Sequence, residues 1–137
     1  MRVSLSVLAV LIAGACGGSS PVSPTTEFIA FKAVSPSDGT AVKAGSTVTV
    51  SVSVTATLVN FNNGRVVMIV QDQVGRVVQQ TGRPQPQATI SKGTATVELS
   101  DSITVPDAAL AVEVIMALFV EGSDRTAAFV KARYPVQ

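Results

Sequence analysis

The chain has 137 residues, with ten Lys and Arg against nine Asp and Glu, no histidine and one cysteine. This near-neutral charge argues against nucleic acid as a partner and against a basic membrane-binding patch. The lack of histidine excludes the usual catalytic triads and histidine-containing zinc sites, and a single cysteine leaves no partner for a disulfide.

The first residues have the pattern of an export signal. Arg2 precedes an apolar run from Val7 to Ala13, and small residues then lead to Cys16. The run is shorter than the roughly 20 apolar residues that a helix needs to cross a bilayer, so we expect it to be removed. Residues 1–15 are therefore predicted to be a signal peptide that forms a helix. Residues 16–26 hold the cysteine and a flexible linker rich in Gly, Ser, Pro and Thr.

The segment Ala13-Gly14-Ala15-Cys16 resembles the lipobox of bacterial lipoproteins. The resemblance implies that the signal is cut before Cys16 and that its thiol is acylated, which anchors an exported protein to the bacterial cell membrane or outer membrane. The family usually has leucine at the position of Ala13. Gly17, where other lipoproteins have aspartate, resembles the pattern of those sent to the outer membrane. The alternative is an ordinary secretion signal, cut after Ala13 or Ala15, in which Cys16 has no role.

Residues 27–137 are predicted to form one all-β domain. The clearest pattern is the alternation of apolar residues with Ser and Thr over residues 47–58, which indicates a strand with one buried and one solvated face. A polar loop follows at residues 60–64, and residues 82–87, with two prolines, are expected to form a rigid surface loop. The other predicted strands, in chain order, are 28–34, 65–71, 76–81, 88–90, 94–100, 110–120 and 126–136, with a short edge piece at 41–43.

Seven to nine short strands separated by turns predict an antiparallel sandwich of two sheets. In this pattern, residues 27–137 resemble the immunoglobulin-like and fibronectin-type-III-like domains of bacterial cell-surface proteins. The Cys–Trp–Cys core of antibody domains is absent, because the chain has no tryptophan and one cysteine. A fold of this kind implies no particular activity.

Catalytic residues, cofactors and metal sites are not predicted. The nine acidic residues are scattered, and the glycines stand at turns instead of forming a phosphate-binding loop. Four aspartates in predicted loops offer oxygen ligands of the kind that calcium prefers. Aspartate also favours turns for its own backbone hydrogen bonds, so a structural role is the simpler reading. These aspartates are Asp38, Asp72, Asp101 and Asp107.

The strongest functional feature is an apolar face. Strands 65–71, 110–120 and 126–136 would be neighbours in an immunoglobulin-like sheet, and alternation leaves apolar side chains pointing outward on all three. A contiguous apolar surface usually marks an interaction site, here for a partner or for self-association. Alternatively, the linker or loop 82–87 covers this face, or the strand register differs. The predicted partner face consists of Val67, Ile69, Ile115, Phe119 and Phe129.

Polar loop tips form a second candidate site at one end of the sandwich, since such ends often bind ligands, although solvated turns look the same. The residues of this loop end are Asn60, Asn62, Asn63, Lys92, Asp124 and Arg125. Together, these features predict a non-catalytic, lipid-anchored module of the cell envelope that binds protein or glycan or takes part in envelope assembly. The alternative is a carrier of a small ligand or an inhibitor of an extracellular enzyme.

Overall fold

A computed structural model of the chain describes residues 26–79 and 82–137, which form five strands and no helix. The predicted signal helix and Cys16 lie outside the described residues. Within them, no helix has the length and apolar character needed to cross a membrane. The strands are β1 (Phe28–Ser35), β2 (Thr47–Asp72), β3 (Gln87–Thr104), β4 (Ala111–Val120) and β5 (Thr126–Pro135).

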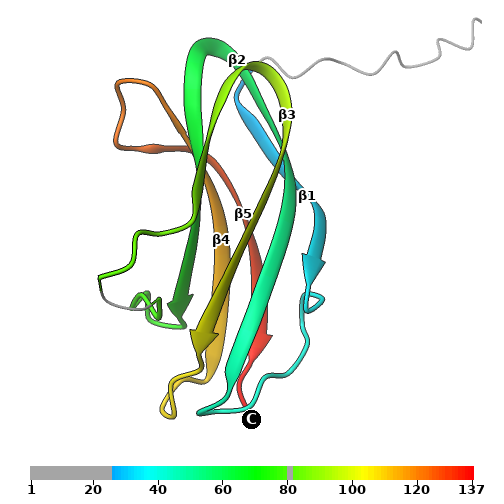
Figure 1. Ribbon diagram of the computed structural model, residues 1–137, viewed down its shortest axis with the longest axis vertical. Helices are drawn as coiled ribbons and strands as arrows, with labels where there is room; N and C mark the ends of the chain where they lie inside the picture. Colours follow the sequence, from blue (N-terminus) through cyan, green and yellow to red (C-terminus); the bar gives the residue numbers. More distant parts are fainter. Residues whose placement is uncertain (1–25, 80–81) are drawn as a thin grey trace, which may run out of the picture.

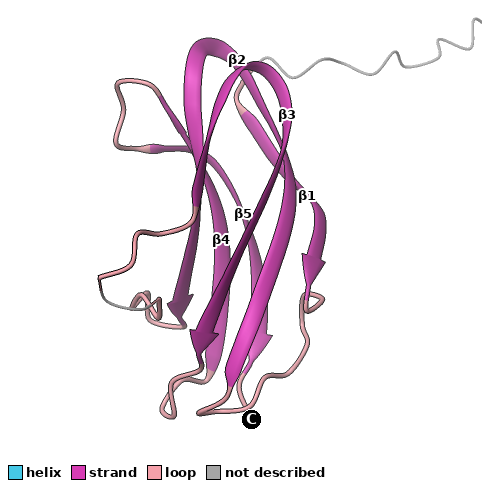
Figure 2. Cartoon of the chain, viewed as in Figure 1, coloured by secondary structure: helices cyan, strands magenta, loops and turns pink. Residues whose placement is uncertain are grey.

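The five strands form one curled antiparallel sheet (Figure 2). Its order is β1-β2-β4-β5, and β3 pairs with the other edge of β2. The curl arises because β2 and β3 are long and bend together, with a shift in their register between Leu58 and Asn63. Before the bend, β2 lies between β1 and β3, and after it β2 lies between β3 and β4. The first half of the sheet therefore folds over the second half, as Figure 1 shows.

The core lies between these two halves. Val54 and Leu58, which alternate with hydroxyl residues before the bend, belong to the same buried cluster as Met68, Met116 and Leu118 from the second half. Burial of each such side chain contributes roughly 1.5–3 kcal/mol to folding. With no disulfide available in a chain of one cysteine, this packing must hold the halves together.

The all-β, antiparallel prediction is confirmed, but two separate sheets of seven to nine strands are not. The predicted strands 47–58 and 65–71 are both parts of β2, and 88–90 and 94–100 are both parts of β3. The polar loop predicted at residues 60–64 is an extended bend. Carboxylates from other segments accept hydrogen bonds from its backbone: Glu27 from the N–H of Asn60 at 2.8 Å, and Glu121 from that of Asn62 at 3.1 Å. They hold the strand extended where the composition predicted a break.

The predicted strand at 76–81 is wrong over its described residues, 76–79. These residues contribute one isolated bridge, between Gln71 and Val77. The Gln79 side chain takes the place of a neighbouring strand, because its amide oxygen accepts a hydrogen bond from the N–H of Val70 and its amide nitrogen donates one to the carbonyl of Met68. Residues 101–104, which lie outside every predicted strand, continue β3 and pair with the start of β2.

Residues 38–44, which we call the closing segment, cover the end of β5. The N–H of Gly39 donates to the carbonyl of Arg133 at 2.9 Å, and the N–H of Val42 donates to that of Pro135 at 2.8 Å. Val42 and Val136 form a parallel bridge, which supports the short edge piece predicted at 41–43. β1 comes close to β5 but does not pair with it. The closing segment, which follows β1 in the chain, makes this pairing instead.

Candidate functional site

The side chains of β2 after its bend, β4 and β5 that point away from the core form the outer face of the second half. The strand register arranges them in rows across the three strands. One row is Val67, Ala117 and Phe129, and the next is Ile69, Ile115 and Lys131. Phe119 lies in the neighbouring row, opposite Arg65. The structure therefore brings all five residues of the predicted partner face together.

These five residues differ in exposure. Phe129 is 61% exposed, whereas Val67 is only 6% exposed. Ile69, Ile115 and Phe119 are half-buried. The end of loop 82–87 lies along the edge of β2, where the carbonyl of Pro86 accepts a hydrogen bond from the N–H of Met68. Because it is buried, Val67 is part of the packing of this face, and the other four residues offer the surface for contact.

A cluster of charges borders the apolar patch. Glu113 is only 6% exposed although it lies on the outer face, and its carboxylate is 3.3 Å from Nζ of Lys131 and 3.4 Å from Nη1 of Arg133. Gln71 also donates to this carboxylate, at 3.4 Å. One carboxylate thus holds two cations in place beside Ile115. This cluster could not be predicted from the sequence, because only the β4–β5 register brings the three charges together.

Arg65 borders the patch at its other end. Its guanidinium carbon is 5.2 Å from the centre of the Phe119 ring, which is the geometry of a cation–π contact. Such a contact orients the guanidinium and leaves its N–H groups available to a ligand. Arg65 was not among the predicted site residues, since only the β2–β4 register places it opposite Phe119.

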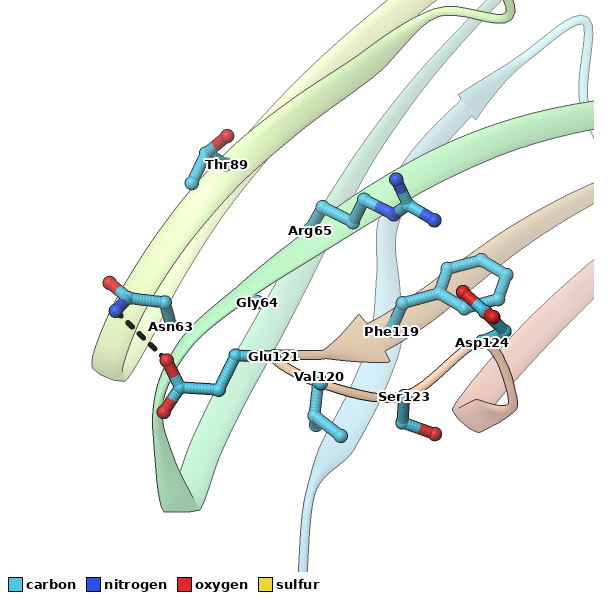
Figure 3. Close-up of a pocket in the computed structure, with 10 residues that line it drawn as sticks. Asn63, Gly64, Arg65, Thr89, Phe119, Val120, Glu121, Ser123 and Asp124 are labelled. Atoms are coloured by element: carbon cyan, nitrogen blue, oxygen red, sulfur yellow. Dashed lines mark hydrogen bonds between the residues drawn. The ribbon is translucent and has the colours of Figure 1, made fainter.

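An open pocket of about 340 Å³ adjoins this contact (Figure 3). Arg65, Phe119, Thr89 and Asp124 contribute side chains from three strands and the β4–β5 turn. Glu121 also lines the pocket, and its carboxylate accepts a hydrogen bond from the amide of the Asn63 side chain at 3.1 Å. The pocket offers a guanidinium, a hydroxyl and carboxylates to a polar ligand.

The predicted loop end lies where β1 begins, at the end of the molecule opposite the C-terminus (Figure 1). Asn60, Asn62 and Asn63 lie in the bend of β2, and Lys92 lies in the facing bend of β3. Asp124 and Arg125 lie in the turn between β4 and β5. The backbone N–H of Asn60 lowers the pKa of Glu27, because it donates to the carboxylate. The asparagines therefore stabilise the bend of β2 through hydrogen bonds to Glu27 and Glu121.

The outer face of the first half is different in character. Hydroxyl side chains lie opposite one another across β2 and β3, with a hydrogen bond of 2.7 Å between Thr49 and Ser102 and one of 2.9 Å between Thr57 and Thr94. A shallow hollow of about 410 Å³ lies on this half, lined by serines and Glu98 together with Ala33, Val34, Val52 and Leu99. Phe28, which is 47% exposed, lies beside Thr57 at the start of β1. The rest of this face has the hydroxyl-rich surface of a solvated sheet, unlike the outer face of the second half.

Three of the four predicted loop aspartates are engaged within the fold, and one of these, Asp101, lies in β3 and not in a loop. Asp38 accepts a hydrogen bond from the N–H of Arg133, Asp72 from those of Val74 and Arg76, and Asp101 from the side chain of Gln79. Residues 26–79 and 82–137 contain no group of three or more acidic residues, histidines or cysteines arranged to hold a metal ion.

The outer face and its pocket therefore offer apolar area, fixed charges and hydrogen-bonding groups on one side of the sheet. No protein-family model matches the chain, and no curated protein is significantly similar to it.

Proposed function

We propose that this protein is a non-catalytic binding module of the bacterial cell envelope, anchored by lipid on Cys16, and that its partner binds the outer face. The observation that best supports a binding role is the register that aligns Ile69, Ile115, Phe119 and Phe129 on one partly exposed surface. A sheet face that meets only water is mostly polar, as the hydroxyl-rich outer face of the first half is, with Phe28 as the exception.

We further propose that the curled sheet is equivalent to the two layers of an immunoglobulin-like sandwich. Counting β2 and β3 as two strands each turns five strands into seven, because each contributes one part to each half. The first layer holds β1 with the adjoining parts of β2 and β3, and the second layer holds the remaining parts with β4 and β5. This equivalence rests on topology and by itself implies no activity.

The anchor would set the orientation of the domain. Residues 17–26 span at most about 36 Å when fully extended, so the start of β1 stays close to the lipid. The loop end would then face the membrane, and the outer face would lie on the side of the molecule, accessible to a neighbour in the envelope.

The composition of the outer face favours a protein partner. Apolar side chains occupy its centre, while Lys131 and Arg133 on one side and Arg65 on the other supply cations at its border. An apolar patch with a charged rim is the usual anatomy of a protein–protein interface. We expect the partner to offer apolar residues ringed by carboxylates, and an acidic glycan would use the rim alone.

The binding proposal is tested by capture of partners from envelope extracts with the full-length chain. The double variant Ile115→Thr and Phe119→Thr keeps residues that favour strands but removes the apolar area. We expect at least a tenfold loss of the captured partner. The control is Thr55→Val with Thr96→Val on the hydroxyl face, which should capture as well as wild type. Equal capture by the face variant and wild type would contradict the proposal.

The anchor is tested separately by metabolic labelling with a fatty-acid probe. Wild type should carry the label and enter the membrane fraction, whereas Cys16→Ala should do neither. An unlabelled wild-type protein that starts at another residue would exclude the lipid anchor and leave the binding proposal standing.

The second candidate function is a carrier of a small polar ligand, and the pocket beside Arg65 is the observation that favours it. Arg65 and Asp124 would pair with opposite charges of the ligand. A rise in melting temperature with small zwitterions or sugars, lost in Arg65→Ala, would favour the carrier. No rise with any of them would favour the binding module.

A further inference from the structure

One part of the sheet edge at β5 has no hydrogen-bonded neighbour, although β1 comes close to β5. β5 is the last strand in the sheet order, so one of its two edges faces away from β4. The backbone of Arg133 and Pro135 points to this edge, since both bond to the closing segment, whereas the N–H of Val136 points the other way to Leu110. The β4–β5 register runs without a shift from Ala128 to Pro135. Odd-numbered residues of this stretch therefore direct their C=O and, except for Pro135, their N–H to the free edge.

Phe129 and Lys131 are the two residues left uncovered there. The closing segment ends its contacts at Arg133, and the register shift beside Leu118 places Ala127 in a bulge. Within the described residues, the four backbone groups of Phe129 and Lys131 have no partner. An uncovered strand edge is a template for pairing with another strand.

We propose that this edge pairs with the same edge of a second copy of the chain, antiparallel and centred on Val130. In this register Phe129 lies opposite Lys131 of the second copy, and Lys131 lies opposite Phe129 of the second copy. All four open backbone groups of each copy then find partners, which gives four hydrogen bonds across a two-fold axis. The bulge on one side and the closing segment on the other limit the contact to these residues.

The side chains fit this register. Phe129, 61% exposed, comes to lie beside a lysine ammonium, which is a favourable aromatic–cation pair across strands. Each Lys131 is also held by Glu113 of its own copy at 3.3 Å, so the two lysines approach with their charge already balanced. A register centred on Phe129 would place Lys131 opposite the bulged Ala127 and leave backbone groups unpaired. Complementarity of charge and of backbone groups thus selects a second copy as the occupant.

This inference goes beyond the proposed function and stands without the lipid anchor. Ile115 and Phe119 are not used by the edge contact, so they remain available to another partner. Pairing of the two β5 edges would join the outer faces of the two copies into one continuous surface. Failure of the capture experiment with Ile115→Thr and Phe119→Thr would leave the pairing inference untouched.

The first test is the molar mass of the full-length protein by light scattering or sedimentation, with the Phe129→Pro variant beside wild type. Proline removes an N–H that points away from β4, so the β4–β5 ladder should persist. We expect wild type to be a dimer and Phe129→Pro to be a monomer with a cooperative unfolding transition. Phe129→Ala keeps the edge but loses the ring, and should dissociate at least tenfold more readily than wild type. A monomeric wild type, or a Phe129→Pro dimer as tight as wild type, would overturn the inference.

The second test fixes the register with disulfides. In the proposed register the two copies of Val130 form a pair without backbone hydrogen bonds, with Cα atoms about 4.5 Å apart, which a disulfide can bridge. The two copies of Ala128 would be about 13 Å apart, because four positions separate them. Val130→Cys should therefore form a covalent dimer on oxidation, and Ala128→Cys, also half-buried, should not. Wild type controls for Cys16. Equal cross-linking by the two variants, or none by Val130→Cys, would overturn the proposal.

Discussion

The hydroxyl of Tyr134 donates a hydrogen bond of 2.7 Å to the carbonyl oxygen of Pro36, across the gap between the two edges of the sheet. Tyr134 is 1% exposed and belongs to the core of the second half, whereas Pro36 lies in the turn that leaves β1. This bond fixes the chain at the point where it passes from β1 to the closing segment.

We expect Tyr134→Phe to lower the free energy of unfolding by about 1–2 kcal/mol, because the ring still packs but the carbonyl of Pro36 loses its donor. Urea unfolding at neutral pH measures this difference. Phe31→Leu, which changes packing without touching a hydrogen bond, serves as a comparison. A Tyr134→Phe variant as stable as wild type would show that water replaces the hydroxyl at no cost.

We expect ionisation of Tyr134 to lower the stability of the protein at high pH. Burial, with a smaller contribution from the Asp38 carboxylate, raises the pKa of Tyr134 from 10.0 to about 12. Below pH 10 the tyrosine is neutral in both states, so its contribution is complete. Between pH 10 and about 12 the unfolded chain releases the proton and the folded chain keeps it, so stability falls by at most about 1.4 kcal/mol per pH unit.

Tyr134 is the chain's single tyrosine, so ultraviolet absorbance of tyrosinate reports its pKa directly. Unfolding measured from neutral to alkaline pH should show a smaller decline for Tyr134→Phe than for wild type. Parallel curves for the two proteins, or a folded-state pKa near 10, would contradict this prediction.

We expect protonation of Glu27 to lower the stability of the protein at low pH. Hydrogen bonds, first of all from the N–H of Asn60, hold the pKa of Glu27 below its usual 4.5. A lowered pKa stabilises the fold above the usual value, and this contribution is lost as the pH falls through the folded-state pKa. Glu27→Gln should therefore lose less melting temperature than wild type between neutral and acid pH. Glu98→Gln, an exposed carboxylate on β3, is the matched control and should behave like wild type.

The bend of β2 leaves no room for a side chain at Gly64. A Cβ at this position would lie 2.6 Å from the carbonyl oxygen of Phe119 and 3.1 Å from Cδ1 of Leu58. We expect Gly64→Ala to destabilise the protein by about 1–3 kcal/mol, since the backbone of β4 must move. Ser91→Ala, on the facing strand and exposed, should change stability by less than about 0.5 kcal/mol. Thermal unfolding of the two variants separates these outcomes.

Local alternation predicted much of the fold. The pattern over residues 47–58 identifies a strand with its buried side, and Val50, Val52 and Val54 are buried as it requires. The bend of β2 could not be predicted in the same way. Its asparagines are typical loop residues, and they stay extended because Glu27 and Glu121, which are far from them in sequence, accept their hydrogen bonds.

The outer face shows the same division between local and long-range information. Alternation places Ile115, Phe119 and Phe129 on one side of their strands, and the structure agrees. The burial of Val67, the contact of Arg65 with Phe119 and the pairing of Glu113 with Lys131 depend on register between strands. These three features could not be predicted, because the sequence alone does not give the register between strands.

The bridge between Val42 and Val136 has a mechanical consequence. It is parallel, and its neighbouring hydrogen bonds connect the closing segment to the final residues of the chain. Force that pulls the start of β1 away from Gln137 would load these bonds together, in shear, instead of breaking them one after another. The domain should therefore resist stretching along its length better than peeling from the side.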